Sequence, residues 1–113
     1  MFTHHVTIPL KAGVCTALSS KIDKSIMPFL RSEKGFQNGT TLVNPDYLIA
    51  ISDTQWETME DAESYQRNGY LKVLEMLSEF VRKTPKDSIF EVLNSSSFPT
   101  IIKQPLNRYP KNQ

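Results

Sequence analysis

The fold of this chain is decided by residues 34–77, KGFQNGTTLVNPDYLIAISDTQWETMEDAESYQRNGYLKVLEML. Within this stretch, two apolar segments are separated by Asn44-Pro45-Asp46. The triplet predicts a turn, because proline fixes φ and the Asn and Asp side chains hydrogen-bond to nearby backbone. The two segments, residues 36–43 and 47–55, are therefore expected to be paired strands. The second is almost continuously apolar at its start, which is typical of a strand covered on both faces.

Helical patterns lie on either side of this pair of strands. Residues 59–82 repeat apolar side chains every three or four positions, and Thr58 is a suitable N-cap with an acidic residue at the capping-box position. Residues 14–32 show the same period. Pro28 predicts a kink or a break within this first helix but not its end, and Gly35 suits the left-handed cap that ends it.

Two more strands complete the predicted domain. Residues 2–10 alternate apolar and polar side chains, and residues 89–93 form a short apolar run. The resulting order predicts an α+β, ferredoxin-like βαββαβ fold with an antiparallel sheet, spanning residues 1–94. A single small domain has nothing left to cover the second face of its apolar central strand, so we expect a homodimer. Residues 95–113, rich in serine and proline, predict an extended C-terminal arm that embraces the partner subunit.

Composition excludes several function classes. Lys and Arg number 13 against 12 Asp and Glu, so the basic excess of a nucleic-acid-binding protein is missing. No apolar run approaches the roughly 20 residues of a membrane span, and the N-terminal residues do not have the pattern of a secretory signal. Cys15 is the single cysteine, so no intrachain disulfide or cysteine-based zinc site is expected. We therefore predict a cytoplasmic protein that binds neither nucleic acid nor membrane.

Four features stand in a characteristic order: Gly35-Phe36 after the first helix, the hairpin of residues 40–51, Trp56 at its end, and Tyr65 on the helix with a Glu-rich first turn. In this order, residues 2–93 resemble the antibiotic biosynthesis monooxygenase family of dimeric α-β barrels. The resemblance implies that two copies pair their sheets face to face into a closed barrel. It implies a pocket for a small aromatic molecule between sheet and helices.

Members of the family that this chain resembles differ in function. Some members are cofactor-independent oxygenases that convert polycyclic phenols into quinones, with Trp, Tyr and Asn side chains near the substrate, and many have no known reaction. Others bind and degrade haem through a histidine about ten residues past the tryptophan. Gln66 occupies that position here, which argues against haem degradation.

His4 is the candidate catalytic base. Strand geometry directs His4 and His5 to opposite faces, so the two cannot bind one metal together. His4 shares its face with Val6 and Ile8 and is the better pocket residue, with an imidazole pKa of about 6.5 in the unperturbed state. The plainer interpretation is that His4 is a strand histidine whose ring nitrogens are hydrogen-bonded within the protein or to water.

Five side chains are candidate substrate-binding residues: Asn38, Trp56, Tyr65, Gln66 and Tyr70. Trp56 can stack on an aromatic substrate, but it can equally plug the corner between strand and helix. Gln66 and Tyr70 lie one helical turn apart and can hydrogen-bond a phenol or carbonyl. The alternative is ordinary packing, with the tyrosine hydroxyls reaching water at the edge.

Two other polar residues are given no catalytic role. Asp53 is interpreted as a pocket residue or a solvent-facing one, and Cys15 as a small buried side chain. The preferred function is oxygenation of a small aromatic or quinone-like molecule without metal or flavin. The alternative is a non-catalytic homodimer that binds a small ligand or a protein partner, with the arm as recognition element. Haem binding without the helix histidine is the weakest hypothesis.

Overall fold

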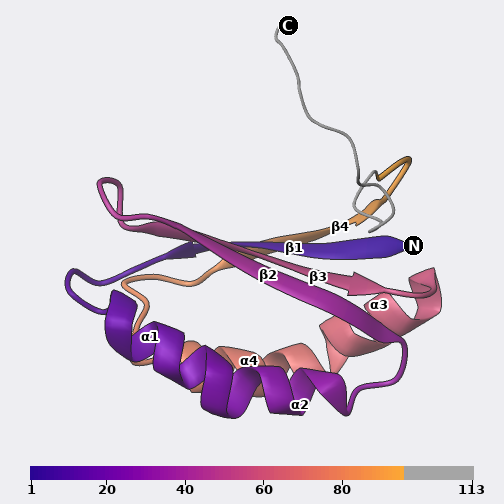
Figure 1. The fold of residues 1–113 in the computed structure, drawn as a ribbon, viewed down its shortest axis with the longest axis horizontal. Coiled ribbons are helices and arrows are strands. Elements are labelled where there is room, and N and C mark those ends of the chain that lie inside the picture. The colour runs from indigo at the N-terminus through magenta and orange to yellow at the C-terminus, as the bar shows by residue number, and fades with distance from the viewer. Residues whose placement is uncertain (96–113) are drawn as a thin grey trace, which may run out of the picture.

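The computed structural model describes residues 1–95, which form one four-stranded sheet with the helices packed on one face (Figure 1). The strands are β1 (Phe2–Pro9), β2 (Phe36–Asn44), β3 (Ile49–Trp56) and β4 (Lys86–Glu91). They pair antiparallel in the order β2-β3-β1-β4. The predicted α+β, ferredoxin-like architecture is confirmed.

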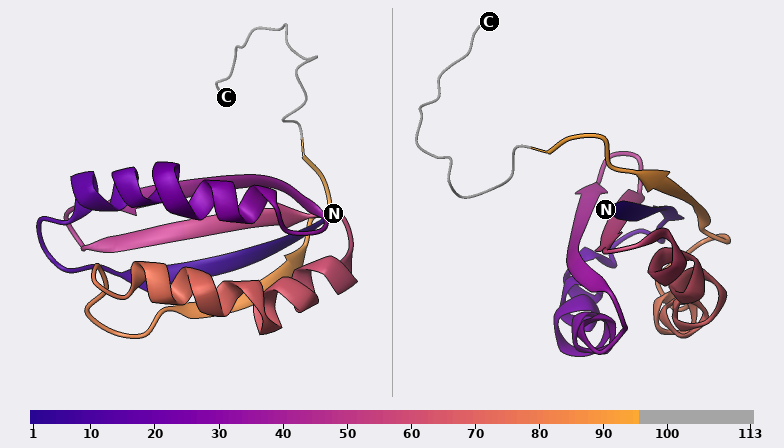
Figure 2. Two further views of the ribbon diagram at one scale, coloured as in Figure 1. Left: turned by 90° about the horizontal axis from the view of Figure 1, so that it is seen from below. Right: turned by 90° about the vertical axis from the view of Figure 1, so that its right-hand side faces the viewer.

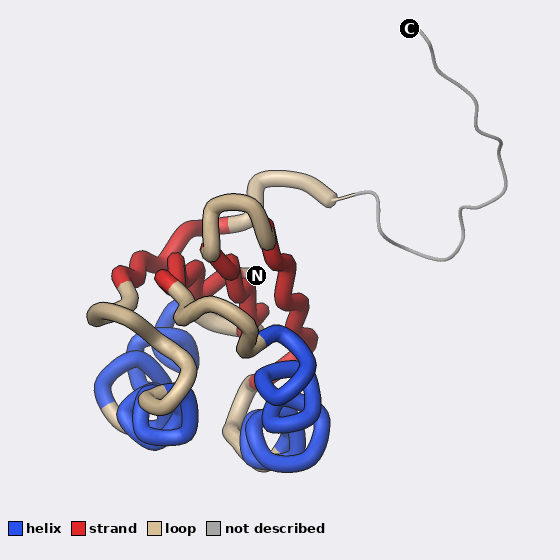
Figure 3. The backbone as a smooth tube through the Cα atoms, turned by 90° about the vertical axis from the view of Figure 1, so that its left-hand side faces the viewer, coloured by secondary structure: helices blue, strands red, loops and turns tan. Residues whose placement is uncertain are grey.

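The helices form two rods that run along the same face of the sheet (Figures 2 and 3). One rod contains α1 (Cys15–Lys21), the π-helical turn η1 (Ile22–Ile26) and α2 (Met27–Arg31). The other contains α3 (Met59–Arg67) and α4 (Gly69–Leu77). In the described part of the chain, no helix is long and apolar enough to cross a membrane.

The first rod places its irregularity in the turn ahead of Pro28. The amide of Met27 donates to the carbonyl of Ile22, five residues back, and Pro28 itself stands in the first turn of α2. Proline is well tolerated there, because its fixed φ suits the first turn of a helix. The rod continues past Pro28, as predicted, and the irregularity takes the form of a widened turn, a feature often found at functional sites.

The second rod differs from the single helix predicted over residues 59–82. Its start is as expected, because the Thr58 hydroxyl accepts a hydrogen bond from the Asp61 amide (3.0 Å). The helix breaks at Asn68, whose side chain donates to the Ser64 carbonyl, and it ends at Leu77. The following residues turn back to the sheet, where the Arg82 amide donates to the carbonyl of Pro9 (3.0 Å).

Two strand boundaries also differ from prediction. β3 begins at Ile49, two residues later than expected, since Leu48 has a positive φ of 55° and still belongs to the turn. β4 begins at Lys86, three residues before the predicted start. The earlier start brings Asp87 into the sheet, where it lies opposite Val6 of β1.

The sheet has one covered and one uncovered face. The core between sheet and helices contains these buried apolar residues: Val6, Ile8, Leu10, Leu18, Ile26, Leu30, Ala50, Trp56, Ala62, Tyr65, Tyr70, Val73, Leu77 and Phe80. The opposite side, here called the bare face, carries His5, Leu42, Asp53 and Phe90, and no element of residues 1–95 covers it. The predicted C-terminal arm lies outside the described residues, apart from Ser95.

Candidate functional site

The candidate site is centred on His4, which is only 1% exposed. His4 on β1 and Asp87 on β4 are diagonal neighbours on the helix side of the sheet, and His4 Nε2 lies 2.8 Å from Asp87 Oδ2. Gln66 of α3 donates through its Nε2 to the same carboxylate oxygen at 2.9 Å. Three elements therefore meet at one oxygen atom, and the sequence separation from His4 to Asp87 is 83 residues.

Burial and hydrogen bonding set the charge states of this pair. Desolvation lowers the pKa of His4 below its ordinary 6.5, although Asp87 acts in the opposite direction. Burial alone would raise the pKa of Asp87, but hydrogen bonds from Gln66 and His4 outweigh it and lower that pKa. At neutral pH, a neutral imidazole thus donates its Nε2–H to a carboxylate. In that tautomer Nδ1 carries the lone pair and is the basic atom.

Aromatic rings surround the imidazole. Tyr70 and Tyr65 meet it edge-on, with ring centroids 4.6 Å and 5.4 Å from that of His4. Tyr65 in turn stacks on Trp56, with centroids 4.6 Å apart and ring planes 24° from parallel. The Trp56 Nε1–H donates to the Thr54 hydroxyl at 2.9 Å, which satisfies the indole inside the core.

The two tyrosines are hydrogen-bond donors, not bases. Burial raises the pKa of Tyr65 and Tyr70 far above their ordinary value, and the nearby Asp87 carboxylate raises both further. Both phenols therefore stay protonated at any pH at which the protein works. Within residues 1–95, the Tyr70 hydroxyl is a buried polar group without a hydrogen-bond partner. Such a group carries an unrecovered desolvation cost, which a bound ligand oxygen would offset.

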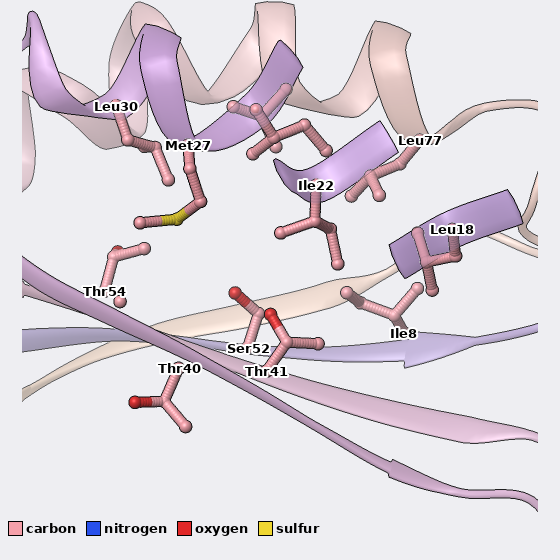
Figure 4. Close-up of a pocket in the computed structure, with 13 residues that line it drawn as sticks. Ile8, Leu18, Ile22, Met27, Leu30, Thr40, Thr41, Ser52, Thr54 and Leu77 are labelled. Carbon is pink, nitrogen blue, oxygen red and sulfur yellow. The ribbon is translucent and has the colours of Figure 1, made fainter. Parts of the chain in front are cut away.

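A cavity of about 30 Å³ adjoins this cluster between the sheet and the helices (Figure 4). Its walls are mainly apolar, and hydroxyl groups of Thr41, Ser52 and Thr54 lie on the sheet side. Thr54 links cavity and cluster, because it stands opposite His4 in the β1–β3 pairing and holds the Trp56 indole. This volume holds one or two water molecules, so an aromatic molecule enters only if the walls move.

Five of the six predicted site residues gather in this region: His4, Trp56, Tyr65, Gln66 and Tyr70. Asn38 lies apart from them. A β-bulge between Phe36 and Asn38 sets Asn38 opposite Gln55 on the bare face, where its side-chain oxygen accepts from the Gly39 amide. Within this subunit, Asn38 therefore does not contact the cluster.

Other sequence interpretations change with the structure. Tyr65 and Tyr70 are buried between the second rod and the sheet, and the Tyr70 hydroxyl does not reach water at the edge. Cys15, expected to be buried, is exposed at the start of α1. His5 points to the bare face as predicted, and its Nδ1 lies 2.7 Å from Asp53 Oδ1.

Asp87 is the site residue that sequence analysis missed. Asp87 lies between the predicted helix of residues 59–82 and the predicted strand of residues 89–93, where the pattern assigns it no partner. A usable signal exists, because Asp87 and Ile89 are two positions apart and a strand places such residues on one face. Residues 1–95 contain no group of three or more His, Cys, Asp or Glu side chains that could hold a metal ion.

Comparisons with known proteins support the fold. No family model and no curated protein sequence matches the chain. Solved structures do match in fold, at low sequence identity. The monooxygenase from the gene ActVA-Orf6 of Streptomyces coelicolor, in complex with nanaomycin D, has a TM-score of 0.69 at 18% identity, covering 83% of this chain and 88% of its own.

Two further solved structures share the fold. SnoaB, a cofactor-independent oxygenase from Streptomyces nogalater, has a TM-score of 0.66 at 14% identity, covering 86% of this chain and 97% of its own. The NE2512 protein of Nitrosomonas europaea, of unknown function, has a TM-score of 0.65 at 16% identity, covering 94% and 95%. The fold is therefore the one found in antibiotic biosynthesis monooxygenases and similar proteins.

Proposed function

We propose that this protein is a cofactor-independent monooxygenase that binds a small phenolic or quinone-like molecule between the sheet and the helices. The observation that carries the proposal is the buried, neutral His4, held by Asp87 and surrounded by aromatic rings. A general base works best when its pKa lies near or below the working pH, which the burial of His4 provides. The functions named for two structures of the same fold, a monooxygenase and a cofactor-independent oxygenase, agree with this chemistry.

The proposed reaction converts one phenol and one O₂ into one quinone and one water. His4 Nδ1 removes the phenol proton, and Asp87 stabilises the imidazolium that forms. The phenolate ring transfers electrons to O₂ and forms a C–O bond, giving a hydroperoxide after protonation. Loss of water from the hydroperoxide leaves the quinone carbonyl. In this scheme the Tyr70 hydroxyl donates a hydrogen bond to a substrate oxygen, and Trp56, Tyr65 and Gln66 form the surrounding wall.

The proposed protein acts as a cytoplasmic homodimer whose bare faces pair into a barrel. Leu42 and Phe90 support this arrangement, because they expose 59% and 55% of their surface on that face. Apolar side chains of this kind, spread over an uncovered sheet, are typical of interfaces. Haem degradation is not proposed, because Gln66 replaces the expected histidine and its amide is hydrogen-bonded to Asp87.

The test is oxygen uptake with a panel of naphthols and anthrones, followed by mass spectrometry with ¹⁸O₂. We expect one labelled oxygen in the quinone product. The variant His4→Gln should lower kcat/KM by roughly 10²–10⁴-fold, the usual contribution of a general base. Tyr47→Phe, a change at an exposed turn residue, is the matched control and should retain activity. Full activity of His4→Gln would remove His4 as the base.

The second candidate function is a non-catalytic binding module. Trp56 and Tyr70 favour it, because their rings are buried and occupy the region around His4 where a reacting substrate would have to lie. Isothermal titration with 1-naphthol and juglone separates the two functions. Binding without oxygen uptake would support the module, and uptake with ¹⁸O incorporation would exclude it.

A further inference from the structure

An open groove of about 400 Å³ runs along the outer side of the cavity, between β2 and the first helical rod. The charged residues Asp23 and Arg31 lie in this groove. The groove and the internal cavity share five lining residues: Leu18, Ile22, Met27, Gly39 and Thr41. The cavity and the groove therefore adjoin, with the side chains of these shared residues between them.

Neighbouring residues of β2 and β3 connect the groove and the cavity on the sheet side. Thr41 of β2 lines both the groove and the cavity, and its partner across the β2–β3 pairing is Ser52. Ser52 lines the cavity but not the groove. Figure 4 shows Thr41 and Ser52 side by side, below Ile22. A step from Thr41 to Ser52 therefore leads from the groove to the cavity.

Met27 and Gly39 face each other across the boundary between groove and cavity. A Cβ atom placed on Gly39 would lie 3.5 Å from the Met27 sulfur and 3.6 Å from its terminal methyl, both ordinary contact distances. The space beside Gly39 thus has room for a Cβ atom and is bounded on one side by the Met27 thioether. Methionine is flexible and adapts to irregular gaps, so it can rotate away at low cost. Met27 also directly follows the π-helical turn, where the backbone hydrogen-bond register changes.

We infer that the groove along β2 is the entrance for a flat aromatic ligand, that Met27 is the gate, and that Gly39 is the residue that keeps the passage open. The aromatic nature of the ligand rests on the proposed function. The positions of the entrance and of the gate rest only on the residues that line both the groove and the cavity. Gly39 is then a specificity-determining residue, since any side chain there narrows the passage.

A cysteine placed inside the cavity tests the route without any substrate. The reporter is Ser52→Cys in a Cys15→Ser background, labelled with N-phenylmaleimide, a flat aromatic thiol reagent. The labelling rate should fall about tenfold or more when Gly39→Val is added, and rise several-fold with Met27→Ala. The double variant should return toward the reporter's rate, because the smaller gate compensates for the added side chain.

Two controls separate gating from general effects. Native Cys15 lines the groove and not the cavity, so its labelling in a chain with Ser52 intact should not respond to Gly39→Val. Ile89→Ala loosens the core at β4, the opposite edge of the sheet from β2. It should accelerate labelling of the internal cysteine far less than Met27→Ala does.

Equal labelling rates in the reporter, Gly39→Val and Met27→Ala proteins would overturn the entrance. Acceleration by Ile89→Ala equal to that by Met27→Ala would also overturn it, because labelling would then follow general loosening. Neither outcome depends on turnover. A protein that shows gated labelling but no oxygen uptake would therefore reject the oxygenase proposal alone.

Discussion

At the scale of single residues, one carboxylate oxygen determines the character of the site. Asp87 Oδ2 receives hydrogen bonds from both His4 and Gln66, which offset the cost of bringing the carboxylate under α3. The imidazole is held at Nε2 in return, so its rotation and its tautomer are fixed. Asp87 is accordingly a positioning residue for His4 and not itself the base.

Asp87→Asn should lower the pKa of His4 further. The carboxylate raises that pKa through its hydrogen bond and its charge, and the amide keeps the shape but removes the charge. Titration of the His4 ring protons by NMR measures the shift. Asp46→Asn, which removes an exposed carboxylate in the turn between β2 and β3, is the control and should leave the His4 pKa in place. An unchanged His4 pKa in Asp87→Asn would contradict the assigned coupling.

Stability should fall in acid in two steps. The pKa of His4 is lowered in the folded protein, so its contribution is complete above about pH 6.5 and is lost as the pH falls toward the folded pKa. The contribution of Asp87, whose pKa is also lowered, is complete above about pH 3.8 and is lost below it. Urea unfolding between pH 7.5 and pH 3 measures both steps.

The first of these steps should be smaller in His4→Gln, because glutamine does not titrate. The free energy of unfolding of that variant should change less between pH 7 and pH 5 than that of the original protein. If the free energy of unfolding changed equally with pH in the two proteins, His4 would not be the residue responsible for the first step.

At the scale of elements, Gly35 joins the first rod to the sheet. Its φ is 82°, and its carbonyl accepts from the amide of Glu57, which fixes the start of β2 beside the end of β3. A side chain there would also collide with Asp61 in the first turn of α3. Local backbone preference and packing between distant elements therefore both require glycine at this position.

Gly35→Ala should lower the free energy of unfolding by about 1–3 kcal/mol, the usual cost of a residue held in a strained conformation. Chemical denaturation measures the loss. Gly39→Ala is the matched control, because its new Cβ meets only ordinary contacts and its φ is not in the left-handed region. Equal stability of the two variants would contradict this account of Gly35.

At the scale of the whole molecule, the bare face is the large surface that no helix of residues 1–95 covers. The helices cover one side of the sheet, and the other presents His5 and Asp53 among apolar and polar side chains. An apolar central strand exposed on one face favours association. The homodimer remains a prediction from that composition.

Leu42→Asp combined with Phe90→Lys should weaken the homodimer by at least about tenfold in Kd, because charge is placed in the proposed interface. Sedimentation velocity over a concentration series measures the dissociation constant. Leu71→Asp is the control, since Leu71 is 58% exposed on α4, on the helical side of the molecule. The face-to-face arrangement would be rejected if the original protein were purely monomeric. It would also be rejected if Leu71→Asp raised the dissociation constant as much as the Leu42→Asp, Phe90→Lys double variant.

The sequence by itself determined the order of strands and helices, the turn at Asn44-Pro45-Asp46, the cap at Thr58 and the opposite orientations of His4 and His5. These features depend on local backbone preferences and on side-chain periods, which neighbouring residues set. Only the tertiary structure decided the charge state of His4, the burial of the two tyrosines and the role of Asp87. Each of these depends on contacts between elements far apart in the chain, where desolvation and hydrogen bonding arise only after the helices pack on the sheet.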